Sequence, residues 1–248
     1  MQRPSAVALV LTACLLPGAP AEADWTRLLD SITGGGDGST QSSAGTLTDE
    51  EVIRGLKEAL DQGARRAVES LGRTDGFFGN PDVRIPMPEK LETVESALRA
   101  LKQDRYADEF LLTMNRAAES AVPEARAILG EAIRQMTVDD ARRILGGPDD
   151  AATQYFRKVG GERLARRMRP IIEDATSRTG VTRAYKSLVD RAGVAARLAG
   201  ADTVDIDAYV TEEALDGLFL LIAREEKRIR ENPVARTSEI LKKVFTGG

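Results

Sequence analysis

The sequence predicts an all-α fold, a single bundle of about nine or ten helices with no β-sheet. Apolar residues recur every three or four positions through most of the chain, which is the period of an amphipathic helix. Residues that favour helix starts and stops separate these apolar segments. Only residues 83–88 (VRIPMP) resemble an extended stretch, and their prolines bar them from the interior of a sheet. These observations leave helices as the building element.

The helices of the first half follow from their capping residues. Thr48 and Glu51 form a capping box, and an apolar stripe leads from there to Gly72, a typical helix stop. An irregular loop then runs from Gly72 to Lys90. Further helix starts are expected at Pro88 or Glu89, Asp104, Pro123 and Thr137.

Glycine and proline divide the second half of the chain. Gly146 and Gly147 end one helix, and separate helices are expected from Asp150 and from Glu162. The second of these should be kinked or broken at Pro170. The apolar run 218–223 is expected to be the central buried helix of the bundle. Later helix starts are expected after Gly180, after Thr211 and at Ser238.

Residues 1–23 have the order of a secretory signal peptide: Arg3, a short apolar run, a Pro-Gly breaker and an A-x-A cleavage site. Cleavage after Ala23 is therefore predicted. Residues 11–14 (LTAC) also resemble a lipobox, so lipidation of Cys14 is the alternative. We expect an exported, periplasmic protein, or one anchored in the envelope through Cys14.

The mature chain then has two parts. Residues 24–47 hold a short amphipathic segment and a Gly/Ser-rich linker, whose composition cannot bury apolar surface. Residues 48–248 are expected to form the helical domain. No stretch of the mature chain is apolar for long enough to predict a transmembrane helix.

Composition excludes several kinds of chemistry. The 248 residues contain no His and one Cys, so a Ser-His-Asp or Cys-His catalytic arrangement cannot be built within the chain. Zinc, copper and haem sites rely on the same residue types, so no such cofactor is expected. Carboxylate, Lys, Tyr, Ser and Thr chemistry or a hard cation remains. The net charge of −4 argues against nucleic acid as a partner.

Four long stretches carry a family resemblance: TDGFFGNPDVRIPMP, MNRAAESAVPEA, GGPDDAATQYFR and YVTEEALDGLFLLIAREEKRIRENPVARTSEILKKVF. Together they resemble a bacterial exported family known only as domain of unknown function 4197, over roughly residues 47–245. The resemblance implies an all-helical exported protein of a Gram-negative-type bacterium. It implies no particular catalytic or binding residue.

The irregular loop is the first candidate site, because long irregular loops in compact domains are often functional. Its oxygen donors around two glycines suggest a calcium loop, although the EF-hand spacing is absent. The favoured interpretation is structural: Asp-Gly and Asn-Pro turns carry Phe side chains that plug the core. The candidate ligand residues of this loop are Asp75, Phe77, Phe78, Asn80 and Arg84, and Asp82 is a further oxygen donor.

Three further clusters have a functional and a structural interpretation. Asp150, Gln154 and Arg157 share one helix face, but Asp is a favoured helix cap and Asp150 with Gln154 is an ordinary pair one turn apart. Asp216 lies beside the apolar run and, if buried, would need an arginine partner. Asp216 belongs to an acidic group that suggests general acid–base catalysis, as in glycoside cleavage. Separately, the basic run RLARRMR at 163–169 suggests binding of an anion or a membrane surface. The structural interpretations are favoured: caps, first-turn acids and a solvated charged face.

We therefore expect a non-enzymatic envelope protein that binds a protein or another envelope component, and peripheral membrane contact is compatible with this. The alternatives are a carboxylate-based hydrolase acting on an envelope component and a calcium-binding protein.

Overall fold

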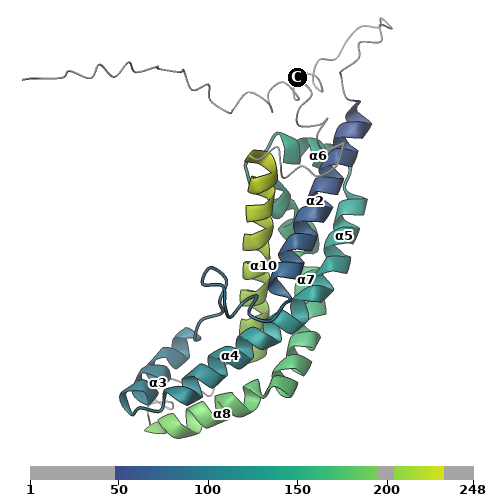
Figure 1. Cartoon of the computed structure of the whole chain (residues 1–248). Coiled ribbons are helices and arrows are strands. Elements are labelled where there is room, and N and C mark those ends of the chain that lie inside the picture. Colours follow the sequence, from purple (N-terminus) through teal and green to yellow (C-terminus); the bar gives the residue numbers. More distant parts are fainter. Residues whose placement is uncertain (1–47, 195–203, 232–248) are drawn as a thin grey trace, which may run out of the picture.

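A computed structural model describes residues 48–194 and 204–231, and within these ranges every regular element is a helix (Figure 1). The predicted all-α class is therefore confirmed, whereas the expected number of nine or ten helices is not confirmed over this part of the chain. The signal peptide, Cys14, the 24–47 segment and the helix expected at 238–245 lie outside the described residues.

One end of the elongated bundle is built by α2 (Asp49–Leu71), α5 (Ala125–Gln135) and α6 (Val138–Leu145). The predicted capping box of α2 is present, since the Glu51 amide donates to Thr48 Oγ1 over 3.3 Å and the Thr48 amide donates back to the Glu51 carboxylate. Pro123 lies in a 3-10 turn, η1 (Val122–Glu124), just before α5 and not in its first turn.

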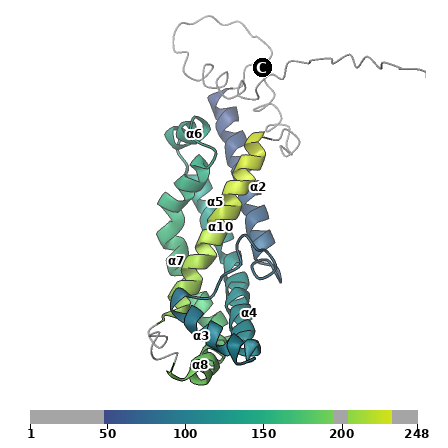
Figure 2. The same ribbon diagram turned by 90° about the vertical axis from the view of Figure 1, so that its left-hand side faces the viewer.

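The other end contains α3 (Glu89–Ala100), the start of α4 (Asp104–Ala121) and α8 (Val181–Ala192), as both views show (Figures 1 and 2). α4 packs along α7 and α8 and so joins the two ends. Its inward face consists of fully buried apolar side chains, among them Phe110, Met114 and Ala117.

α7 (Ala151–Thr179) is one continuous helix, so the two helices expected from Asp150 and Glu162 and the break at Pro170 are wrong. Pro170 is exposed, so the carbonyl that loses its helical partner can face water. Met168 and Ile172, on the inner face, are fully buried. Their burial holds the chain in register across the proline, because tertiary packing commonly outweighs local propensity.

α10 (Ile206–Glu231) packs against α7 and α2 along most of its length. It begins before the expected start, which was after Thr211. Thr211 is buried, and its hydroxyl donates to the Asp207 carbonyl inside the helix. The apolar run 218–223 is mainly core, as predicted, but Leu220 is exposed. Among the described residues, no helix is long and apolar enough to cross a membrane.

Candidate functional site

The irregular loop is an ordered plug between α2, α4 and α10. Phe77 is fully buried, so it belongs to the core and offers no surface to a ligand, contrary to its choice as a ligand-binding residue. Phe78 is half-buried, and the Arg84 guanidinium lies 4.2 Å from the centre of its ring. The plug interpretation therefore describes Phe77 well, whereas Phe78 and Arg84 reach the surface.

The backbone of this loop is held by two buried polar side chains of α4. The amides of Phe77 and Phe78 both donate to Glu119 Oε1, over 3.1 and 3.2 Å. Asn115 receives the Ile85 amide on its Oδ1 and donates its Nδ2 to the Ile85 carbonyl. Buried polar groups need such partners, so these side chains serve to seat the loop.

The oxygen donors of the loop face arginines or the loop's own backbone. Arg116 donates to Asp75 over 2.7 Å, and Arg224 donates to Asp82 over 2.6 Å. Asn80 Oδ1 accepts the Asp82 amide in a turn two residues long. No group of three or more His, Cys, Asp or Glu that could hold a metal occurs in the described ranges.

The helix-face candidates are separated by the fold into two pairs. Gln154 donates to Asp150 over 2.9 Å, the expected pair one turn apart. Arg157 donates to Asp216 over 2.9 Å and also covers the ring of Phe219. Asp216 thus has an arginine partner, but its side chain is 58% exposed, so the pair is not the buried one that would have required such a partner. An exposed pair of this kind contributes little to stability.

Most of the other charged candidates also meet an opposite charge. The arginines of the 163–169 run pair with nearby acids: Arg163 with Glu131, Arg166 with Glu162, Arg167 with Glu124 and Arg169 with Glu173 and Asp205. In the acidic group of α10, burial and then the charge of Asp216 raise the pKa of Glu213.

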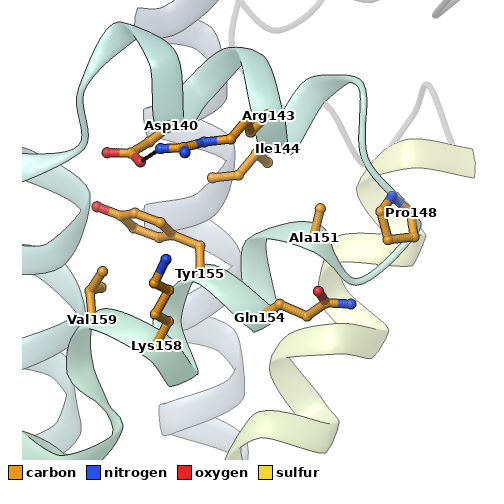
Figure 3. A pocket seen from close by; sticks show the side chains of 9 residues that line it. All are labelled: Asp140, Arg143, Ile144, Pro148, Ala151, Gln154, Tyr155, Lys158 and Val159. Carbon is orange, nitrogen blue, oxygen red and sulfur yellow. Dashed lines mark hydrogen bonds and ion pairs between the residues drawn. The ribbon is translucent and has the colours of Figure 1, made fainter.

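The structure adds a groove that none of these clusters predicted. It lies between α5, α6 and α7 and consists of two adjoining cavities of about 300 and 230 Å³, which share Tyr155 and Val159. Tyr155 and Lys158 project from α7 toward α6, while Asp140 and Arg143 come from α6 (Figure 3). Of the candidate residues chosen from sequence, Gln154 lines the first of these cavities and Arg163 lines the second.

A buried ion pair of α10 holds the turn that joins α6 to α7, the two helices on either side of the groove. Glu226 accepts the Ala152 and Thr153 amides at the start of α7, over 2.9 and 3.0 Å. Arg230 contacts Glu226 over 2.8 Å and donates to the Ile144 carbonyl at the end of α6. The carboxylate therefore lies at the positive end of one helix and the guanidinium at the negative end of another, which favours both.

The same turn needs a glycine because α6 and α7 approach so closely. A Cβ on Gly147 would lie 2.7 Å from the Ala151 Cβ and 2.8 Å from the Arg143 carbonyl oxygen. Such contacts are far inside van der Waals separation, so any side chain at position 147 would push the walls of the groove apart.

The floor of the groove is apolar and its rim is basic. Ile144, Ala151 and Val159 line the floor, and Val159 is 48% exposed. Lys158 forms no hydrogen bond or ion pair with the described residues, so its ammonium group is available. Arg143 carries a second cation on the opposite wall, where it pairs with Asp140.

Tyr155 and Asp140, two further titratable groups of the groove, already have hydrogen-bond partners within the protein. The Tyr155 hydroxyl donates to the Ala132 carbonyl over 3.2 Å, and burial followed by the charge of Asp140 raises its pKa, so the phenol is neutral at neutral pH. The hydroxyl and amide of Thr137, and then Arg143, lower the pKa of Asp140. Asp140 is thus an ionised helix cap, and the groove offers cations above an apolar floor.

Comparison with family models places the chain in a family without an assigned function. The family model described as protein of unknown function (DUF4197) matches residues 46–246, which is most of the chain. No curated protein and no solved structure matches it.

Proposed function

Since the chain belongs to the DUF4197 family of proteins of unknown function, we propose a function from its groove: this is a non-enzymatic, exported envelope protein that binds an amphipathic anion between α6 and α7. The ligand would carry one anionic group and one short apolar group. The observation that carries this proposal is the apolar floor beneath Lys158 and Arg143. Ligand pockets typically combine an apolar lining with a few polar groups that fix orientation.

The fluorescent probe 1-anilinonaphthalene-8-sulfonate tests the groove, because it joins an aromatic body to a sulfonate. We expect the folded protein to bind it with a rise in fluorescence. Lys158→Glu should raise the dissociation constant at least about tenfold, the effect of losing roughly 1.4 kcal/mol. Lys158→Arg should retain binding, because it keeps the charge.

The matched control is Lys186→Glu, which makes the same charge change on an exposed residue of α8. Near-ultraviolet circular dichroism must show that each variant keeps its tertiary packing, because this probe also binds loosely packed states. Decanoate, an amphipathic carboxylate, should compete with the probe. Equal titration curves for Lys158→Glu and the parent protein would refute binding in the groove.

Export is supported by the order of Arg3, the apolar run and the small residues Ala21 and Ala23. Expressed in a Gram-negative host, the full chain should reach the periplasm and have the mass of residues 24–248. Cys14→Ala should leave both results unchanged. A product that begins at Cys14 and carries lipid would instead establish the lipoprotein alternative, and retention of residues 1–23 in the cytoplasm would contradict export.

A further inference from the structure

A second hollow lies between α2 and α5, with three arginines around it. It has a volume of about 540 Å³ and is open to solvent, with Arg65 on α2 and Arg126, Gly130 and Arg134 on α5. We call this hollow the α2–α5 furrow. Arg126, Gly130 and Arg134 are spaced by four residues, so they share one face of α5.

The middle position is a glycine, and this leaves room between the two arginines. A Cβ on Gly130 would lie 3.4 Å from Arg134 Nη1, so the Arg134 guanidinium already extends over this position. Arg126 starts about one further turn, or ~5.4 Å, along the helix. Arg126 and Arg134 therefore both line the furrow on either side of Gly130.

Both acids that line the furrow have an arginine partner, and for Asp61 this partner is Arg65 of the furrow itself. Asp61 pairs with Arg65 over 2.7 Å, and Glu124 pairs with Arg167 over 3.6 Å. The side chains of Arg126 and Arg134 form no hydrogen bond or ion pair with the described residues. The hydrogen bond and charge of Arg163 lower the pKa of Glu131, and the nearby charge of Arg134 adds to this effect, but the carboxylate of Glu131 is bonded to Arg163.

A further cation reinforces this positive charge. Lys57 of α2 donates to the Arg134 carbonyl over 3.3 Å, which places an ammonium group at the last turn of α5. The furrow thus has three arginines and two acids in its lining, with Lys57 close by, and two of its guanidinium groups, those of Arg126 and Arg134, have no hydrogen-bond or ion-pair partner among the described residues. Like charges held close together repel, and a bound anion relieves that repulsion.

We infer that the α2–α5 furrow binds a phosphate group, held by Arg126 and Arg134 with Arg65 opposite. The guanidinium group is planar and donates two parallel hydrogen bonds to phosphate, which makes arginine the usual residue for this recognition. The phosphate can belong to a phospholipid headgroup or to a soluble phosphate compound. This inference is independent of the groove beside Tyr155, which lies between α6 and α7.

Inorganic pyrophosphate, titrated calorimetrically into the purified protein, tests the furrow. We expect binding, and a dissociation constant at least about tenfold weaker for Arg126→Gln combined with Arg134→Gln. The matched control combines Arg183→Gln with Lys186→Gln, two exposed cations of α8, and should bind as the parent does. Lys158→Glu should also bind pyrophosphate normally, which separates this site from the groove.

Vesicle flotation distinguishes the two sources of phosphate. The ligand is a headgroup if the protein floats with phosphatidylglycerol vesicles but not with phosphatidylcholine vesicles. In that case the furrow variant, Arg126→Gln with Arg134→Gln, should no longer float with the phosphatidylglycerol vesicles. Binding of pyrophosphate without flotation assigns a soluble phosphate compound. The inference is overturned if neither probe binds, or if the α8 control weakens binding as much as the furrow variant does.

Discussion

Glu226→Gln should lower the free energy of unfolding by about 3–5 kcal/mol, the usual cost of breaking a buried ion pair. Glu226 is 4% exposed, and its two oxygens receive two amides and a hydroxyl at the start of α7. A glutamine has the same shape, but its NH₂ would face a backbone N–H, and the guanidinium of Arg230 would remain buried without its counter-charge. Urea unfolding measures the change.

Two comparisons show whether the loss arises from the buried pair. Glu231→Gln removes a charge from the same helix where it is exposed and pairs with Lys227 over 3.6 Å, so we expect less than about 1 kcal/mol. Replacing Glu226 and Arg230 together by leucine and methionine should recover part of the loss, since no unpaired charge stays buried. If Glu226→Gln lowers the free energy of unfolding no more than Glu231→Gln does, a structural role for the buried pair is contradicted.

Phe77→Ala should destabilise the protein by about 3–5 kcal/mol, the range for removing a fully buried aromatic ring. The ring packs against α10, where a Cβ on Gly217 would lie only 2.8 Å from Phe77 Cε1. The adjacent Phe78→Ala is the natural control, because Phe78 is half-buried under Arg84. This substitution should lower the free energy of unfolding clearly less than Phe77→Ala does. Thermal and urea unfolding measure both variants.

Gly217→Ala tests the contact between the loop and α10 directly. Alanine normally stabilises a helix relative to glycine by about 1 kcal/mol. Here we expect it to destabilise the parent protein, because the added methyl group overlaps the Phe77 ring. The same change should be less harmful in the Phe77→Ala protein, where the ring is gone. Equal effects in the two backgrounds would show that the two residues are not coupled.

The sequence by itself determined the features that depend on neighbours three or four residues apart. The capping box at Thr48, the helix cap at Thr137, the end of α2 at Gly72 and the Asp150–Gln154 pair all have this spacing. Their partners are fixed by the geometry of a single helix turn, so the residue types at the right positions are enough to predict them. The all-α class follows from the same periodicity.

The tertiary structure alone decided which distant residues meet. Glu226 and Ala152 are 74 residues apart, Glu119 and Phe77 are 42 apart, and Arg157 and Asp216 are 59 apart. In the sequence, Glu226 is one of many acids in a charged helix, and nothing local distinguishes it from the exposed Glu231. The continuation of α7 through Pro170 was likewise set by packing against other helices, because burial of Met168 and Ile172 outweighs the local preference of proline.

The groove and the α2–α5 furrow belong to this second group. Each is formed by side chains from different helices, so residues such as Lys158 or Arg126 look like ordinary surface cations until the packing shows which of them lack a partner among the described residues. A repeat every three or four residues shows which face of a helix is buried, but not which other helix covers it. That choice depends on how side chains from the whole chain fit together, and it is what gives this protein its two candidate binding surfaces.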